Sequence, residues 1–431
     1  MLSALRLKVQ QYLERDALLR NGNFVRYWIS AILNDFGSYI SALALPLCSA
    51  ILLHATPAQM GILGAASAIP FALLALPTGV FLDRHRKLPV LLASKLVQAL
   101  TLGSVPLVYW LGHLSIEWMY GVALISGCCS LVGGGAEQIF LTSLIGRERL
   151  IEAQSKFAAV DSVARVVAPG IAGVLIQWLT APFAVIVNAL GFICSILILR
   201  NLKANDPKPE PSKQHMLRDI HDGLLFIWRT PLLRTLAWGA GIWHMLFYGY
   251  AALSVLFCTR ELGMTAGLLG IAQMVGGVGV LLSSILVRPL SARYGPTGAM
   301  LTGIGLTACA FAAMPAIPAH LFGSATGSAV ASTLVSLLLD CGVMLFFMPY
   351  MTLRQKVTPD AYLGRMVSTM RFLTVASAPA GALLAGYLGE HLSIRTGLTC
   401  VAVGGIALTL AMVFAPALRN VPEHLAPAQP S

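Results

Sequence analysis

Residues 79–90 read Gly-Val-Phe-Leu-Asp-Arg-His-Arg-Lys-Leu-Pro-Val, so five consecutive charged or titratable side chains stand between two long apolar runs. The run before them covers residues 60–82, and the run after them covers residues 88–111. A charged segment this short cannot lie in hydrocarbon, because an ionised side chain at membrane depth costs several kcal/mol. The stretch therefore predicts a surface turn between two membrane spans, and its three cations favour the cytoplasmic side.

The composition is that of a protein that crosses a membrane many times. Of the 431 residues, 57% are hydrophobic and 11% are charged, whereas a soluble domain carries about 25% charged residues. The net charge of +11 does not indicate a nucleic-acid partner, because the basic residues are spread over the gaps between apolar runs. The eight cysteines form no C-x-x-C pair, so neither a disulfide framework nor a metal centre is expected.

Twelve apolar runs are long enough to cross a bilayer as helices of about 20 residues. We place them at residues 24–54, 57–82, 88–111, 115–145, 150–178, 181–200, 231–259, 264–290, 296–316, 325–353, 360–389 and 395–418. The pattern predicts an all-α polytopic membrane protein with twelve transmembrane helices. They form two sets of six, over residues 24–200 and 231–418.

Three polar segments complete the predicted domain organisation. Residues 201–230 include Asn-Asp-Pro-Lys-Pro-Glu-Pro at 205–211 and are predicted to be a cytoplasmic linker whose second part is helical. Residues 1–23 are predicted to be a cytoplasmic N-terminal segment, in which apolar residues at helical spacing favour a short surface helix. Residues 419–431 are predicted to be a cytoplasmic tail.

The distribution of Lys and Arg predicts the orientation. Nearly all of the 29 Lys and Arg residues fall in the termini, in the linker or in the turns on one side, whereas the turns on the other side hold only Arg260 and Arg395. Cytoplasmic loops carry an excess of Lys and Arg. Both termini and the linker are therefore expected in the cytoplasm, and the protein is expected in the plasma (inner) membrane.

The two sets of helices look like an internal repeat. The stretch from Arg20 to Trp28 parallels the stretch from Arg229 to Trp238 at an offset of 209–210 residues, and Ala-Gly-x-Leu at 172–175 recurs at 385–388. The sequence thus predicts two pseudo-symmetric six-helix bundles.

The turn at 79–90 resembles a signature of the major facilitator superfamily (MFS) of transporters. Its spacing G-x-x-x-D-R-x-R-K-x-P is similar to that of the loop between helices 2 and 3 in the bacterial efflux branch, and Arg-Asn-x-Asn-Phe-x-x-x-Trp at 20–28 resembles the start of helix 1 there. The resemblance implies the MFS fold of two parallel six-helix repeats. It also implies a gating role for the motif residues Gly79, Asp83, Arg84, Arg86 and Lys87.

A second stretch resembles the motif G-P-x-x-G-G that antiporter members carry on helix 5. Here it reads Ala-Pro-Gly-Ile-Ala-Gly at 168–173. Gly170 and Gly173 have no side chain, so another backbone can approach them closely, and Pro169 interrupts the hydrogen-bond ladder and permits a bend. Ordinary packing of small residues accounts for the stretch equally well.

Four ionisable side chains are expected inside the spans, where such groups are rare and mark functional sites. Asp35 lies in span 1, Glu137 in span 4, His244 in span 7 and Asp340 in span 10. In the MFS fold, which the chain resembles, these four spans line the central cavity. All four residues are therefore candidates for proton coupling, with Asp35 the first choice and Asp340 the second.

Other interpretations of these groups remain open. Glu137 can pair with Lys95, and a buried His244 can be an ordinary hydrogen-bond donor. Asp35 and His244 lie 209 residues apart, which matches the repeat offset, so we expect them to face each other across the pseudo-twofold axis.

Further side chains in the spans allow a structural or a substrate-binding role. Asp161 and Arg165 lie four residues apart, where a structural ion pair is favoured. Arg371 has no obvious local partner and can meet an anionic substrate group or an acid of another helix. Aromatic residues of span 7 can give the substrate cavity an adaptable apolar wall, and core packing explains them equally well. They are Trp243, Phe247 and Tyr248.

These features predict a secondary transporter rather than an enzyme. No G-x-x-x-x-G-K-[ST] occurs, and Gly-Gly-Val-Gly at 276–279 follows no strand, so neither a nucleotide nor any other cofactor is expected. We predict an exporter that couples the efflux of a small amphipathic molecule, such as a drug or siderophore, to proton entry by alternating access. An importer of the same fold, working as a proton symporter, and a non-transporting membrane sensor or assembly protein are the alternatives.

Overall fold

The structure, a computed structural model, describes residues 18–146, 148–202, 216–321, 323–359 and 362–419. Helices account for almost all of these residues, and the described ranges contain no β-sheet. A lipid environment offers no hydrogen-bond partners, and a helix is the element that satisfies its backbone groups within one segment. The all-α fold predicted from the sequence is confirmed.

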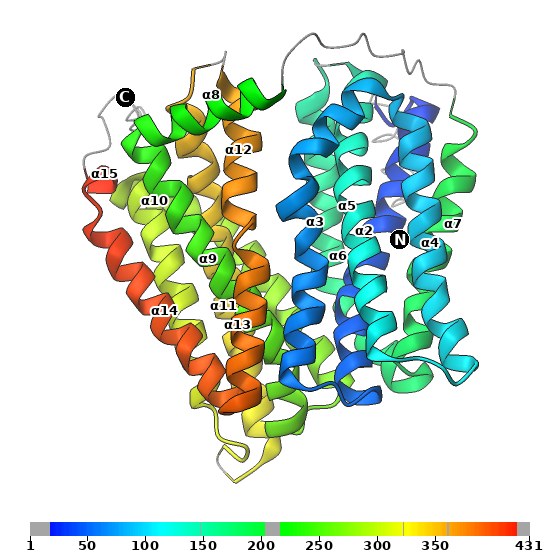
Figure 1. Cartoon of the computed structure of the whole chain (residues 1–431), viewed down its shortest axis with the longest axis vertical. Coiled ribbons are helices and arrows are strands. Elements are labelled where there is room, and N and C mark those ends of the chain that lie inside the picture. The colour runs from blue at the N-terminus through cyan, green and yellow to red at the C-terminus, as the bar shows by residue number, and fades with distance from the viewer. Residues whose placement is uncertain (1–17, 147, 203–215, 322, 360–361, 420–431) are drawn as a thin grey trace, which may run out of the picture.

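The first half of the chain forms one bundle of six long helices (Figure 1). They are α2 (Gly22–Leu47), α3 (Pro57–Arg84), α4 (Lys87–Trp110), α5 (Ile116–Ile145), α6 (Leu150–Leu179) and α7 (Ala181–Leu199). Local signals set the helix starts. At the start of α3, the Thr56 hydroxyl accepts a hydrogen bond from the Gln59 amide, and the Gln59 side chain accepts one from the Thr56 amide, which is a capping box.

The second half forms the second bundle. Its long helices are α9 (Pro231–Leu256), α10 (Ala266–Ala316), α11 (Ala325–Lys356), α12 (Leu363–Val375), α13 (Ala378–His391) and α14 (Ile394–Phe414), and α15 (Pro416–Arg419) follows them. The predicted span 360–389 corresponds to α12 and α13. The break between these helices lies at Ser377, whose hydroxyl donates a hydrogen bond of 2.6 Å to the carbonyl oxygen of Gly241 in α9.

Helix α10 crosses the membrane twice. A straight helix of its 51 residues would be about 75 Å long, more than twice the ~30 Å hydrocarbon thickness. At Gly295, φ is 71° and ψ is 168°, so the chain turns there and starts a new helical limb. The two limbs are the predicted spans 264–290 and 296–316. With this turn, the 11 long apolar helical segments of the described chain make the twelve predicted crossings.

The two bundles repeat an irregular turn. α2 continues into a π-helical turn, η1 (Cys48–Leu52), and α9 continues into η2 (Phe257–Glu261). A residue with positive φ follows each turn, His54 at 50° and Gly263 at 64°. These features lie 209 residues apart in each case, which supports the internal repeat seen in the sequence.

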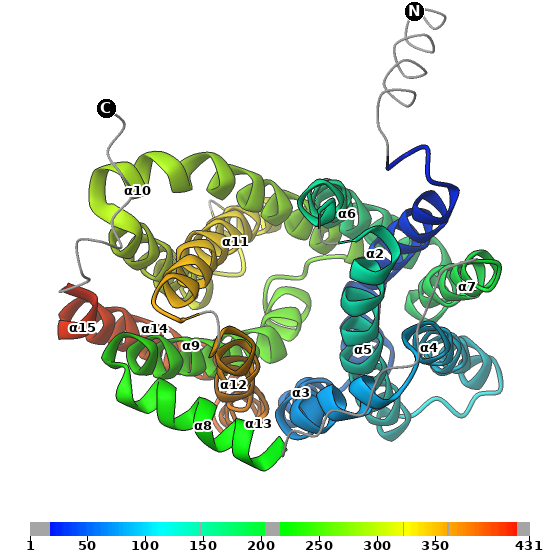
Figure 2. The same ribbon diagram turned by 90° about the horizontal axis from the view of Figure 1, so that it is seen from above.

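The two ends of the molecule differ, and we call them the linker end and the far end. The linker end carries α8 (Met216–Arg229), which lies across the top of the second bundle in Figure 1 and faces the viewer in Figure 2. Asp222 of α8 forms an ion pair of 3.9 Å with Arg365, and Phe226 stacks on Tyr362 with ring centroids 5.0 Å apart. The far end carries η1 and η2.

Helix α8 is the helical second part of the predicted linker. The first part of that linker, at residues 203–215, lies outside the described residues. So do the surface helix expected within residues 1–17 and the predicted tail beyond residue 419.

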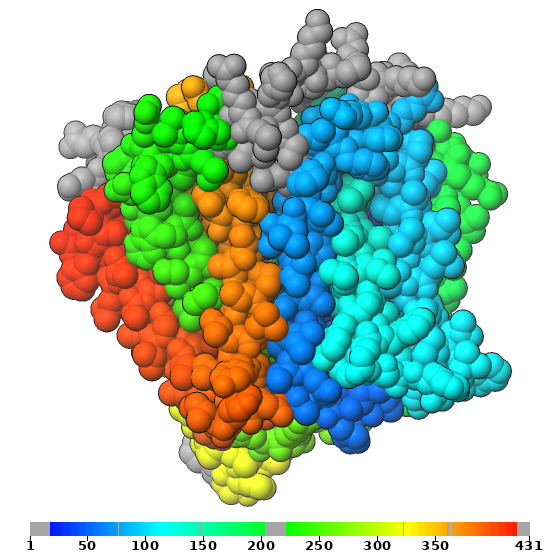
Figure 3. Space-filling model, in the orientation of Figure 1, coloured from blue at the N-terminus to red at the C-terminus, as the bar shows by residue number. Residues whose placement is uncertain are grey.

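The bundles meet mainly where α3 packs on α13 and α6 packs on α10, and α3 also contacts α9 and α12. Figure 3 shows the surface of α12 and α13, in orange, directly beside the blue surface of α3. The closest backbone approaches lie towards the far end, where Gly386 backs onto Gly61 and Gly173 backs onto Gly270. Because glycine has no side chain, the backbones of two helices can come into direct contact at these positions.

Candidate functional site

Three carboxylates of the first bundle line one cavity of about 400 Å³, which we call the acid cavity. They are Asp35 of α2, Glu137 of α5 and Asp161 of α6. Two of the three have a cation beside them. Lys95 Nζ lies 4.0 Å from Glu137 Oε1, and Arg165 Nη2 lies 3.5 Å from Asp161 Oδ2.

Asp161 is further fixed by Tyr39, whose hydroxyl donates a hydrogen bond of 2.7 Å to Asp161 Oδ1. The Arg165 guanidinium also lies over the Tyr39 ring, 5.3 Å from its centroid. Asp35 differs, because no described residue forms a hydrogen bond or ion pair with its carboxylate. Three acids thus share two cations. Lys95 also interacts electrostatically with Asp35, but Asp35 is the one acid of the three with no ion pair within 4 Å to a described residue.

A second cavity of about 250 Å³ lies between the bundles, and we call it the charged cavity. Tyr39 and Arg165 line it from the first bundle, and Phe247, Gln273 and Asp340 line it from the second. Asp340 interacts electrostatically with Arg165. Nevertheless, within the described chain its carboxylate has neither a hydrogen bond nor an ion pair within 4 Å.

A third cavity of about 460 Å³ adjoins the charged cavity, since Ala251 lines both. None of the described residues that line it is Asp, Glu, Lys, Arg or His, so we call it the neutral cavity. Its wall combines apolar residues with small polar side chains. The polar side chains belong to Ser38, Ser41, Ser67, Gln98, Ser126, Ser130, Asn188 and Tyr248.

The predicted cavity residues of span 7 have different surroundings. Phe247 lines the charged cavity and Tyr248 the neutral cavity. Trp243 is 3% exposed, and its indole N–H donates to Thr307 at 3.4 Å. It lines none of the three cavities and belongs to the core of the second bundle.

His244 lies among aromatic rings of the second bundle. Its ring centroid is 5.3 Å from that of Trp243 and 5.5 Å from that of Phe347, and its Nδ1 lies 2.8 Å from the Ala240 carbonyl oxygen. It lines none of the three cavities. Asp35 lines the acid cavity, and His244 is not among the residues that line it.

Arg371 of α12 reaches across the bundle boundary. Its guanidinium lies 5.6 Å from the ring centroid of Phe71 in α3, and Phe71 lines the neutral cavity. The partner of Arg371 is thus an aromatic ring, a favourable cation–π contact.

The charged turn lies at the linker end between α3 and α4. The ammonium of Lys87 donates to the carbonyl oxygens of Leu82 and His85, so it caps the end of α3. Asp83 is exposed, and no described residue forms a hydrogen bond or ion pair with its side chain. A β-carbon added at Gly79 would meet no atom within 4 Å.

The helix 5 motif lies on the interface between the bundles. A β-carbon at Gly173 would lie 2.9 Å from the Ala266 carbonyl oxygen, and one at Gly170 would lie 3.0 Å from the Met274 sulfur. Pro169 lies inside α6, and its carbonyl oxygen faces Gly270 of α10. The missing side chains therefore allow α10 to approach α6.

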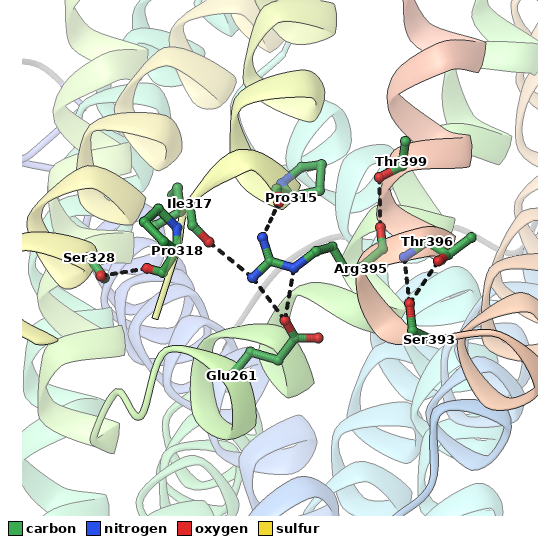
Figure 4. A network of polar contacts seen from close by, with 9 residues as sticks. All are labelled: Glu261, Pro315, Ile317, Pro318, Ser328, Ser393, Arg395, Thr396 and Thr399. Carbon is green, nitrogen blue, oxygen red and sulfur yellow. Dashed lines mark hydrogen bonds and ion pairs between the residues drawn. The ribbon is translucent and has the colours of Figure 1, made fainter. Parts of the chain in front are cut away.

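Sequence reasoning missed a polar network at the far end. Arg395 forms an ion pair of 3.0 Å with Glu261 and also donates to the carbonyl oxygens of Pro315 and Ile317 (Figure 4). The signal was available, because Arg395 and Arg260 are the two Lys or Arg residues in the turns of that side.

Arg260, the neighbour of Glu261, connects the two bundles. Its Nη2 donates to the carbonyl oxygens of Ala55 at 2.7 Å and Ala50 at 3.4 Å, both next to η1 or within it. The amide of Ala58 in α3 also donates to Glu390 of α13 at 3.2 Å. These contacts hold the bundles together at the far end.

The chain matches known transporters over most of its length. The profile described as Major Facilitator Superfamily matches residues 27–382. The multidrug efflux pump Tap of Mycolicibacterium fortuitum is 27% identical over 422 residues, which cover 93% of this chain and 98% of that protein. The enterobactin exporter EntS of Citrobacter koseri is 24% identical over 334 residues, which cover 77% and 76%.

The fold is also found among solved structures. The crystal structure of the nucleoside transporter NupG is similar with a TM-score of 0.70 and 14% identity, covering 93% of this chain and 100% of that one. Together with the two six-helix bundles, the profile match identifies the family: the chain belongs to the Major Facilitator Superfamily of transporters and is not an enzyme.

Proposed function

We propose that the protein is a secondary active exporter that uses proton entry to drive the efflux of a small amphipathic molecule. Export is supported by the relatives, since Tap is described as a multidrug efflux pump and EntS as an enterobactin exporter. The proton part rests on one observation. Asp35 lines the acid cavity without a partner among the described residues, while Glu137 and Asp161 each have a cation beside them.

The electrostatics of the acid cavity favour Asp35 as the proton carrier. An ionised group inside a membrane is costly, and one bound proton neutralises the single negative charge left by three acids and two cations. The carboxylate can then bind a proton from one side of the membrane and release it to the other, provided that its surroundings change between the two conformations. The paired acids Glu137 and Asp161 already have counter-charges and act as fixed charges.

The contacts at the far end define the conformation. If the excess of Lys and Arg places the linker end in the cytoplasm, the Arg260 contacts and the glycine crossings close the outer side. This conformation is then the inward-facing state. The outward-facing state requires the bundles to separate at the far end and to close at the linker end, which is the rocking motion of repeat-based transporters.

The charged turn is proposed to act in the opposite closure. Asp83 is exposed and lacks a partner among the described residues here, and Gly79 has open space beside it. Both are therefore available to a helix of the second bundle when the linker end closes. We propose that this contact with the second bundle, formed when the linker end closes, is the gating role that the motif implies.

The substrate is proposed to bind between the bundles, in the neutral and charged cavities. The neutral cavity, at about 460 Å³, is within the usual size range of small-molecule sites, and the charged cavity, at about 250 Å³, is slightly smaller than that range. Residues of both bundles line each cavity, so a bound molecule senses the change between states. Phe247, Tyr248 and Arg371 contribute to this region.

Flux into proteoliposomes tests the proposed function. The full-length protein is reconstituted, the membrane potential is clamped, and ethidium uptake is followed as the first probe of a panel of amphiphiles. Ethidium is a permanent cation, so a pH gradient does not change its distribution unless a carrier couples ethidium transport to proton movement. Antiport predicts accumulation in vesicles that are acidic inside. Asp35→Asn abolishes that accumulation but retains downhill exchange, and Glu117→Gln, on an exposed helix start, behaves as wild type.

Each other outcome rejects part of the proposal. Accumulation that occurs only with acid outside identifies a proton symporter. Continued uphill accumulation by Asp35→Asn removes Asp35 as the coupling group and moves the test to Asp340 and then to Glu137. No movement of any probe in either gradient, with the protein folded, favours the non-transporting alternative.

A further inference from the structure

We propose that Asp340 is the binding site for a positively charged amine, and that the transporter selects amphiphiles that carry a single positive charge. The body of such a molecule occupies the neutral cavity, and its ammonium group reaches Asp340 in the adjoining charged cavity. This inference rests on the proposed transport function and adds the chemical class of the substrate and the residue that recognises it.

The position of Asp340 suits a ligand. It lies in the middle of α11 and lines the charged cavity between the bundles. Helix α10 carries Gly276 opposite the carboxylate, and a β-carbon there would collide with Asp340 Oδ2. At the next residue, Gly277, a β-carbon would lie 2.8 Å from the carbonyl oxygen of Arg165, so the missing side chain lets the α6 backbone approach α10. The glycines at 276–279 thus bring Asp340 and α6 to one place on α10.

The charges around this cavity leave one negative charge unmatched. Arg165 is the one cation among the described residues that line this cavity. Its Nη2 lies 3.5 Å from Asp161 Oδ2, and Tyr39 donates a hydrogen bond to the other oxygen of Asp161. Two carboxylates, Asp161 and Asp340, therefore share one guanidinium. An ammonium group close to Asp340 would balance this charge, and opposite charges attract more strongly in a buried site than in bulk water.

Arg165 offers little to an anionic substrate. Its Nη2 is engaged by Asp161, and its Nε is buried and lacks a hydrogen-bond partner in the described chain. Arg165 therefore enters the cavity with its charge already engaged by Asp161, whereas the Asp340 carboxylate has no ion pair within 4 Å to a described residue.

The neutral cavity sets the rest of the specificity. It is the larger space, and its described lining contains no Asp, Glu, Lys, Arg or His, so a second charge on the substrate would be desolvated without a partner. Its serines, Asn188 and Tyr248 can bond neutral polar groups. The arrangement fits an amphiphile with a neutral body and one amine.

Binding of matched fluorescent probes tests the inference. N-(2-aminoethyl)dansylamide carries a primary ammonium at neutral pH, N-(2-hydroxyethyl)dansylamide is its neutral counterpart, and dansylglycine carries a carboxylate. All three share the dansyl body, whose fluorescence rises in an apolar site. We expect the full-length wild-type protein in nanodiscs to bind the amine at least tenfold more tightly than the alcohol and to bind dansylglycine most weakly.

The variants separate recognition from folding. Asp340→Asn is expected to bind the alcohol with wild-type affinity, which shows that the site is intact, and to bind amine and alcohol within about twofold of each other. Asp340→Glu retains part of the preference. Glu117→Gln, the acid-to-amide control outside the cavities, keeps the whole preference.

Several results would overturn the inference. They are equal wild-type affinities for amine and alcohol, no binding of the three probes, tightest binding of dansylglycine, or an undiminished amine preference in Asp340→Asn. The binding experiment and the flux experiment can fail separately. A protein that selects the amine at Asp340 but shows no pH-driven flux supports the site and rejects the coupling. Proton-driven flux without amine preference does the reverse.

Discussion

Gly173 of α6 lies against the backbone of Gly270 in α10, and the same contact recurs between Gly386 of α13 and Gly61 of α3. Gly61 and Gly270 are 209 residues apart, and Gly173 and Gly386 are 213 apart, so the two crossings are repeat-related. A β-carbon at Gly173 would lie 3.1 Å from the Gly270 Cα, and one at Gly386 would lie 2.9 Å from the Gly61 Cα. Both bundle contacts at the far end depend on these glycines.

The first prediction is that Gly173→Val shifts the protein away from this conformation. Overpacking typically costs about 1–3 kcal/mol, and every 1.4 kcal/mol changes an equilibrium tenfold. Spin labels at His113 and His391, one on each bundle at the far end, should report a longer distance and a broader distribution. Gly121→Val is the control, because a β-carbon at Gly121 meets nothing within 4 Å. An unchanged distribution in Gly173→Val contradicts the prediction.

The second prediction is that Arg260→Ala weakens far-end closure. The substitution removes two hydrogen bonds to the carbonyl oxygens of Ala55 and Ala50, and hydrogen bonds from a charged group contribute about 1.5–3 kcal/mol. Native Cys258 is a suitable reporter, because it is 4% exposed and lines the charged cavity. With the other cysteines replaced, an impermeant thiol reagent at the far end should label it several times faster.

Arg293→Ala, at the linker end of the second bundle, is the matched control for this experiment and should leave the labelling rate unchanged. Equal rates in Arg260→Ala and wild type would mean that the contact does not hold the far end closed.

The third prediction concerns Asp83, which we propose acts in closure of the linker end rather than in substrate contact. Asp83→Asn should lower transport strongly while the affinity for the probes changes by no more than a few fold, because Asp83 lines none of the three cavities. Glu148→Gln, another exposed acid at the same end, should transport as wild type. Normal transport by Asp83→Asn, or loss of binding, would argue against the gating role.

The fourth prediction concerns orientation. His113, in the turn between α4 and α5, and His221, on the exposed face of α8, lie at opposite ends of the molecule. Single cysteines at these positions, on a background without native cysteines, should react oppositely with an impermeant reagent added to intact cells. The His113→Cys protein is labelled and the His221→Cys protein is not. The reverse pattern would place the linker end outside.

Much of the architecture could be predicted because membrane helices obey local rules. Each span must be apolar and must satisfy its backbone internally, so the charged turn after Leu82 and the polar linker mark the boundaries without reference to any other part of the chain. Ion pairs within one helix can also be predicted locally, because residues four apart lie on the same face of the helix. Asp161 and Arg165, four residues apart, form the expected ion pair at 3.5 Å.

Contacts between helices needed more than local rules. The predicted alternative pairing of Glu137 with Lys95 is present at 4.0 Å. Asp35 lines the acid cavity, whereas the His244 ring packs against Trp243 and Phe347. Sequence offset gives equivalent positions in the two bundles. It does not give the rotation of each helix about its axis, which decides where a side chain points.

The sequence by itself determined the twelve-span chain, its repeat and its family, since hydropathy, charge and motif spacing are properties of short segments. The tertiary structure decided which of the other acids have partners. Glu137 of α5 lies beside Lys95 of α4, whereas no described residue forms an ion pair within 4 Å with Asp35 or Asp340. The physical reason is that a charge in a membrane is balanced by whatever the neighbouring helices bring within a few ångströms, and those helices are distant in the chain.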